Sequence, residues 1–142
     1  MKTETLEKLN SFFEQEPLLK GEAVSEAEIG RAESALQVHF SDEYREFVTR
    51  FGGAILGPYP IYGLRRAEPM DDRLWSVVEV TNHFRTKAWP GSGSWYVISM
   101  DHSGNPIGVD SLGQLHSFDH DTGQMIEVAP DFETYLLACI GA

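Results

Sequence analysis

The chain contains 142 residues, of which 42% are hydrophobic and 23% are charged, a composition that supports a folded core and excludes a wholly disordered protein. Its 22 acidic residues outnumber 11 basic residues and give a formal net charge of −11. Such a chain repels phosphate backbones and anionic lipid surfaces, so we expect no nucleic-acid or membrane partner and favour a basic protein partner.

The first predicted helix lies near the N-terminus. The spacing of Leu6, Leu9, Phe12 and Phe13 places these side chains on one helix face, and Pro17 interrupts the pattern. The same region lacks the apolar stretch of a signal peptide, and the sequence has one cysteine, so we expect a cytoplasmic protein.

Two further helices are predicted to begin at residues suited to N-capping. Ser25 opens a capping-box pattern that includes Glu28, and Ser41 can cap the next helix. Gly52 and Gly53 end the third helix, because glycine tolerates the left-handed conformation found there. The apolar stripe of the second helix is Ile29, Ala32 and Leu36. The apolar stripe of the third helix is Tyr44, Phe47, Val48 and Phe51.

The middle of the sequence combines turn residues with a fourth helical pattern. The prolines and glycines of residues 54–64 predict two short edge strands joined by a turn. Asp71 or Asp72 can then cap a helix. The predicted apolar face of that helix carries Leu74, Val77, Val78 and Thr81.

The remaining sequence has the composition of β-strands. Residues 95–100 are apolar on both faces, which predicts a central strand. Three turn signals follow, each with an acidic residue before a glycine, as suits tight turns between antiparallel strands. The strands between these turns are expected near residues 107–110, 114–118 and 124–128. A final helix carries Phe132, Tyr135, Leu136, Cys139 and Ile140 on one stripe.

This order of elements predicts an α+β protein rather than an alternating parallel α/β fold. We expect a single domain over residues 1–142, in which an antiparallel C-terminal meander packs with the N-terminal helices and a closing C-terminal helix.

The charge is unevenly distributed along the sequence. No lysine or arginine occurs from Ala88 to Ala142, whereas that segment contains seven acidic residues. Chance and solubility are one explanation, and an acidic surface for a cationic partner is the other.

The sequence offers little support for catalysis or for a cofactor. It lacks a phosphate-binding glycine motif and a nucleophile elbow, and Cys139 lies on an apolar stripe. His102, His116 and His120 lie near aspartates, but their spacing matches no metal-binding signature. We therefore expect neither an enzyme nor a bound cofactor, and a metal protein that uses these histidines is the weaker hypothesis.

Several segments resemble the SUKH superfamily, in the order expected of it. These are residues 24–36, the helix start at 40–47, Phe51-Gly52-Gly53, the strand at 61–64, the hairpin region 96–110 and the closing helix at 132–136. Ser41 stands where the family pattern has proline, but serine is still a good helix cap. The resemblance implies a single α+β domain without catalytic residues. The superfamily includes immunity proteins of bacterial polymorphic toxin systems and a yeast cell-wall assembly regulator.

The resemblance therefore implies an immunity protein that binds and neutralises a cognate toxin domain. Many such toxins are nucleases, and a basic nuclease domain would suit an acidic inhibitor. A regulatory or scaffold protein that binds a host protein is the alternative. The predicted contact residues are the acids Asp101, Asp110, Asp119, Asp121 and Glu127 with the aromatic anchors Tyr59 and Tyr62. Each aspartate is equally suited to forming a turn.

Overall fold

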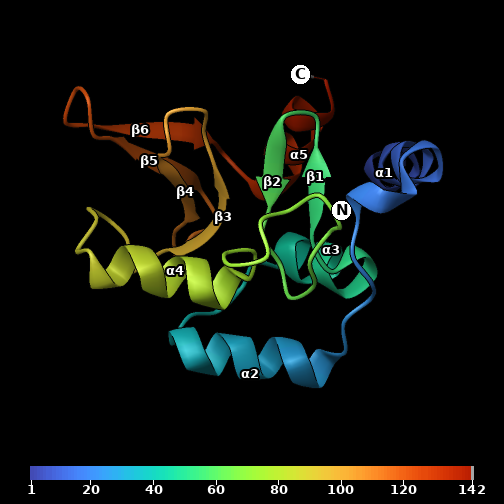
Figure 1. Ribbon diagram of the computed structural model, residues 1–142, viewed down its shortest axis with the longest axis horizontal. Helices are drawn as coiled ribbons and strands as arrows, with labels where there is room; N and C mark the ends of the chain where they lie inside the picture. Colours follow the sequence, from blue (N-terminus) through green and yellow to red (C-terminus); the bar gives the residue numbers. More distant parts are fainter. Residues whose placement is uncertain (142) are drawn as a thin grey trace.

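The computed structural model describes residues 1–141, in which helices occupy the first half and a β-meander occupies most of the second (Figure 1). The helices are α1 (Thr3–Gln15), a 3-10 turn η1 (Pro17–Leu19), α2 (Glu26–Leu36), α3 (Asp42–Phe51), α4 (Val77–Thr86) and α5 (Phe132–Ile140). The strands are β1 (Ala54–Leu56), β2 (Tyr59–Ile61), β3 (Tyr96–Met100), β4 (Pro106–Val109), β5 (Leu115–Asp119) and β6 (Gln124–Ala129).

These elements form the predicted α+β fold. Strands β3 to β6 make a four-stranded antiparallel sheet in sequence order, and β1 and β2 make a separate hairpin. Figure 1 shows the meander at one side of the molecule and α1 at the other, with the β1–β2 hairpin and α5 between them. Ala142, the last residue of the predicted domain, lies outside the described residues. No helix among residues 1–141 has both the length and the hydropathy needed to cross a bilayer.

The predicted N-caps of α2 and α3 are confirmed. The Ser25 hydroxyl accepts a hydrogen bond from the Glu28 N–H, and the Ser41 hydroxyl accepts one from the Tyr44 N–H, both at 3.3 Å. Each bond satisfies an N–H that the first helical turn leaves without a backbone partner.

The prediction for the start of α4 was wrong. Neither Asp71 nor Asp72 caps the helix, because α4 begins only at Val77, and the Asp71 carboxylate binds the backbone and guanidinium of Arg73. Ser76 is the N-cap and accepts from the Val78 N–H at 3.2 Å, so Leu74 precedes the helix. The buried face of α4 is consequently Val77, Val80, Thr81 and Phe84.

The prediction that residues 95–100 form a central strand was also wrong. Strand β3 is the first strand of the sheet and is nevertheless buried, because neighbouring elements cover its outer edge. The Tyr62 N–H donates to the Ile98 carbonyl at 2.8 Å, and the Val97 N–H donates to the Thr81 hydroxyl at 2.8 Å. A strand that is apolar on both faces can lie between two other strands or at an edge that other elements cover, and the sequence pattern alone does not distinguish these positions.

Aromatic side chains join the helices to the sheet. Tyr44 packs against Phe40, Tyr96 and Phe132 with ring centroids 5.0 to 5.3 Å apart, and all four side chains are buried. The Tyr44 hydroxyl donates to the Tyr62 carbonyl at 2.7 Å, so the buried Tyr44 side chain has a partner for its polar group.

Candidate protein-binding surface

The meander places its acidic turns at two opposite ends of the sheet. Turns 101–105 and 119–123 follow β3 and β5, so they lie at the same end, which we call the acidic end. The His120 ring Nδ1 contacts the Asn105 side-chain oxygen and ties the two turns together. The turn between β4 and β5 reverses the chain at the opposite end. The structure therefore brings together Asp101, Asp119 and Asp121 and separates them from Asp110.

Two carboxylates of the acidic end also hold the backbone of their turns. Asp101 Oδ1 accepts from the N–H groups of Ser103 and Asn105, each at 2.9 Å. Asp119 Oδ1 accepts from the Asp121 N–H at 2.9 Å. The Asp121 side chain is 71% exposed, and its Oδ1 lies 3.3 Å from His120 Nε2. The turn-forming role and a binding role are therefore compatible at this end.

Asp110 is bound into its own turn at the other end of the sheet. One carboxylate oxygen accepts from the backbone N–H groups of Leu112 and Gln114, and the other lies 2.7 Å from His116 Nε2. Burial raises the pKa of this carboxyl, but the hydrogen bonds from His116 and the backbone outweigh it and leave the pKa below its usual value.

The strand β6, which carries Glu127, forms an exposed edge of the sheet. It pairs with β5 alone, and no strand among residues 1–141 pairs with its other edge. Residues 124–127 are all exposed, including two large apolar side chains: Met125 is 51% exposed and Ile126 is 44% exposed.

A groove of about 320 Å³ lies between the inner face of the sheet and α5. Its floor is a cross-strand row formed by Ile107, Ser117 and Ile126, which the strand register places side by side on one face. Tyr135 of α5 lines the opposite wall. Asp101 lines the groove as well, so the groove adjoins the acidic end.

The two predicted aromatic anchors have different surroundings. Tyr59 is half-buried and lines the groove, with its ring centroid 5.1 Å from that of His102. Tyr62 is 6% exposed, and burial raises the pKa of its hydroxyl to about 12. Tyr59 therefore has a surface to offer a partner, whereas Tyr62 contributes to the core.

The histidines considered as metal ligands do not converge. His102 packs on Tyr59 beside β2, and His116 stacks on Trp95 with centroids 5.6 Å apart. No group of three or more histidine, cysteine, aspartate or glutamate side chains with metal-binding geometry occurs in residues 1–141. Cys139 is buried, and this burial raises the pKa of its thiol to about 11.

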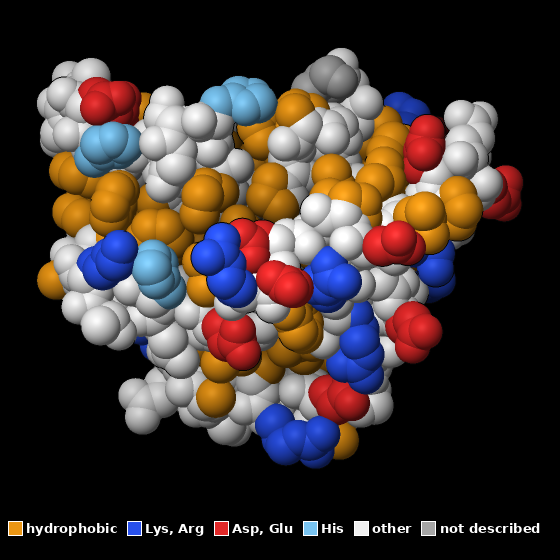
Figure 2. Space-filling model, in the orientation of Figure 1, with side chains coloured by type: hydrophobic (Ala, Val, Ile, Leu, Met, Phe, Trp, Pro, Cys, Tyr) orange, Lys and Arg blue, Asp and Glu red, His pale blue; other side chains and the backbone are white. Residues whose placement is uncertain are grey.

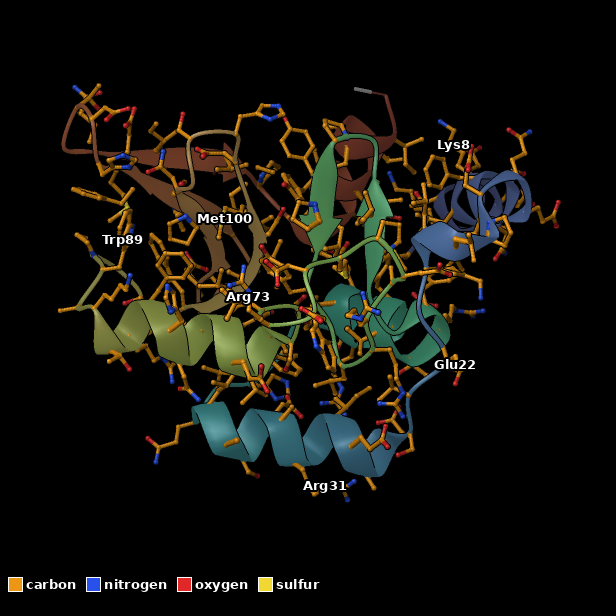
Figure 3. All side chains as sticks on the ribbon, in the orientation of Figure 1. Lys8, Glu22, Arg31, Arg73, Trp89 and Met100 are labelled. Carbon is orange, nitrogen blue, oxygen red and sulfur yellow. The ribbon has the colours of Figure 1, made fainter. Side chains whose placement is uncertain are left out.

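Basic side chains lie away from the acidic end. The labelled Lys8, Arg31 and Arg73 project from α1, α2 and the loop before α4 (Figure 3). Figure 2 shows lysine and arginine side chains over the helical part of this face, while the corner over the β5–β6 hairpin carries acidic and histidine side chains. Several arginines are also neutralised locally, since Arg45 binds Glu33 and Arg65 binds Glu28.

The free edge of β6 and the adjoining groove were not predicted from the sequence. The adjacent apolar pair Met125 and Ile126 was a signal, but its exposure depends on β6 being the last strand of the sheet. Strand order is a tertiary property that the sequence pattern does not specify.

Together, the helical half that ends in a glycine pair, the meander and the closing helix define an α+β protein of the SUKH superfamily. The model of the SUKH_5 family, described as SMI1-KNR4 cell-wall, matches residues 3–140, and the chain belongs to this family. A comparison with curated proteins finds no match.

Ser41 makes two hydrogen bonds at the start of α3. The Ser41 N–H donates to the Tyr96 hydroxyl at 2.9 Å, and its hydroxyl caps α3. Proline has no N–H and could make neither bond. Ser41 therefore links the start of α3 directly to the sheet.

Proposed function

We propose that this protein is an immunity protein that binds a basic toxin domain through the acidic end of the meander and neutralises the toxin by occluding it. SUKH proteins are generally immunity or regulatory proteins rather than enzymes, which supports a binding role. The observation that carries the proposal is the concentration of unneutralised carboxylates at the acidic end, beside exposed apolar surface.

A basic toxin domain matches this surface in charge. Nucleases bind polyphosphate substrates and therefore carry positive surfaces, which makes a nuclease a suitable target. Carboxylates at a rim accelerate encounter with such a surface, and buried apolar contacts then slow dissociation. The protein would meet its toxin in the cytoplasm of the cell that it protects.

The first test is a neutralisation assay with the toxin domain encoded beside this chain. The toxin is expressed in a sensitive cell with and without this protein, and the purified pair is examined by size-exclusion chromatography with light scattering. We expect rescue of growth and an equimolar complex. If the toxin is a nuclease, cleavage of nucleic acid should stop at one equivalent of inhibitor.

Neutral variants separate charge from turn formation. Asp101→Asn and Asp119→Asn keep a side-chain oxygen that accepts from the turn N–H groups, and together with Asp121→Asn they remove three charges. A matched control, Glu4→Gln, Glu7→Gln and Glu14→Gln, removes three exposed charges from α1. We expect the first triple variant to slow association about tenfold at low salt and the control to have little effect. No rescue and no complex would remove toxin neutralisation and favour the regulatory alternative.

A further inference from the structure

The two edges of the four-stranded sheet differ in how their backbone groups are satisfied. On β3, the Ile98 carbonyl and the Val97 N–H bond to Tyr62 and Thr81, and the Ser99 hydroxyl donates to the Pro60 carbonyl at 2.6 Å. On β6, no hydrogen bond within residues 1–141 reaches the outer edge from another element. One edge is closed by the fold, and the other remains able to pair.

Strand β6 has limited protection against edge pairing: one charged residue, Glu127, and a register irregularity at Val128 near its C-terminal end. Its six residues make it the longest strand of the sheet, and it contains neither lysine nor proline. Residues 124–127 nevertheless pair regularly with β5, and this exposed stretch, which includes Met125 and Ile126, is a suitable template for another strand.

The groove supplies side-chain selectivity next to this edge. Ile126 belongs both to the exposed edge and to the groove floor. In an added strand, alternate side chains would point to the inner face of the sheet, over the groove. An apolar side chain of the incoming strand would thus be directed toward Ile126 and Tyr135.

The charges around β6 determine which kind of strand could pair with its free edge. Asp119 and Asp121 lie at the hairpin tip where β6 begins, and Glu127 lies on the strand itself. A second copy of this chain would bring its own Glu127 and its net charge of −11 against these acids. An extended segment with basic residues would instead neutralise them.

We propose that the partner adds an extended, lysine- or arginine-bearing segment to the free edge of β6 and places an apolar side chain in the groove. This inference rests on the proposed function, since the toxin domain is the expected owner of the segment. The contact would extend the sheet to five strands and cover Met125, Ile126 and the groove together.

The first experiment uses the complex with the toxin domain. Amide hydrogen exchange of the outward-facing N–H groups of residues 124–129 should slow markedly on binding, because an added strand pairs these groups, whereas the alternate N–H groups already face β5. Ile126→Lys should weaken binding about thirtyfold or more, as truncating or charging an interface anchor does. The matched control is Leu112→Lys, which charges a side chain that is 83% exposed at the opposite end of the sheet and should leave affinity unchanged.

Ile126→Thr is a second variant, which keeps a β-branched residue in the strand. It should unfold at a temperature similar to that of the parent protein and should weaken binding less than Ile126→Lys does. A tight complex in which residues 124–129 exchange as in the free protein, or one that tolerates Ile126→Lys, would refute the edge-pairing inference and leave the proposed function intact.

The second experiment does not depend on the toxin. A synthetic eight-residue peptide of alternating lysine and valine is titrated into the isotope-labelled protein, and amide chemical shifts are followed by NMR. Shifts should concentrate on β6 and the acidic end, and a glutamate–valine peptide should produce none. If the peptide binds but the protein does not neutralise the toxin, β6 is still a strand-binding edge, but the toxin is not the partner that supplies the strand. Shifts spread over the helical half, or dimerisation through β6, would overturn the proposed occupant.

Discussion

The aspartates of the meander both carry negative charge and hold the backbone of their turns. Asp101, Asp110 and Asp119 each accept hydrogen bonds from backbone N–H groups of their own turn. Such bonds explain why an acidic residue precedes a glycine in every turn of the meander. They also mean that a lysine substitution would damage the turn as well as the charge, so asparagine is the informative replacement in a binding test.

Asp110 gives a prediction for stability against pH. Its folded-state pKa lies below the usual value, so its contribution is complete above the ordinary carboxyl range, about pH 4, and is lost as the pH falls through the lower folded-state pKa. Asp110→Ala should lower the free energy of unfolding by about 2 kcal/mol at neutral pH, because it removes the turn bonds and the His116 contact. The difference from the parent protein should shrink below about pH 4.

Urea unfolding at a series of pH values measures this difference. Asp110→Asn is the control, since it keeps an oxygen acceptor for the turn but has no carboxyl to titrate. An Asp110→Ala deficit that stays constant into the acid range would show that the ionised carboxylate does not provide the stability.

At the scale of elements, Gly52 and Gly63 connect the end of α3 to the segment after β2. Gly52 has a φ of +77°, and its carbonyl accepts from the N–H groups of Leu64 at 2.7 Å and Arg65 at 3.0 Å. Gly63 passes so close that a Cβ on it would lie 2.0 Å from the Gly52 oxygen. The close approach of two backbones, rather than the helix stop alone, explains why glycine is needed here.

A pair of glycine substitutions tests this contact. Gly63→Ala should destabilise the protein by about 3 kcal/mol, because a methyl group cannot fit against a fixed carbonyl without moving the backbone. Gly30→Ala in α2 should stabilise it by about 0.5 to 1 kcal/mol, because its site has no atom within 4 Å and alanine favours the helix. Thermal and urea unfolding of both variants provide the measurement, and equal effects would mean that the Gly63 backbone moves freely.

The sequence was most informative where structure is local. Ser25 and Ser41 were recognised as caps because a cap depends on residues three positions away, and the turns of the meander followed from acid–glycine pairs. The start of α4 was misplaced because Asp71, Asp72 and Ser76 are all suited to capping, and the serine is the one directly before the helix. The position of β3 and the open edge of β6 depend on contacts distant in sequence, such as that between Tyr62 and Ile98. The structure therefore places Asp101, Asp119 and Asp121 at one end of the sheet, whereas the apolar surface beside them was not predicted from the sequence.

At the scale of the whole molecule, the separation of charge carries an energetic consequence. All basic residues lie at or before Lys87, so the acids of the meander have no cationic neighbour along their own half of the sequence. Like charges that are not neutralised destabilise a compact state. Retaining such a surface is understandable if a partner neutralises it, because binding sites commonly sacrifice stability of the free protein.

Charge reversal at Asp121 and Glu127 tests this trade-off directly. Both side chains are exposed, and neither carboxylate accepts a turn hydrogen bond, so Asp121→Lys with Glu127→Lys should leave the fold unchanged. The free protein should gain about 0.5 kcal/mol of unfolding free energy at low salt. The gain should fade as salt shortens the screening length to about 3 Å near 1 M. The same variant should bind the toxin domain more weakly. If the variant is more stable and binds the toxin domain equally well, these acids serve solubility. If it is more stable but binds more weakly, these acids serve binding of the partner.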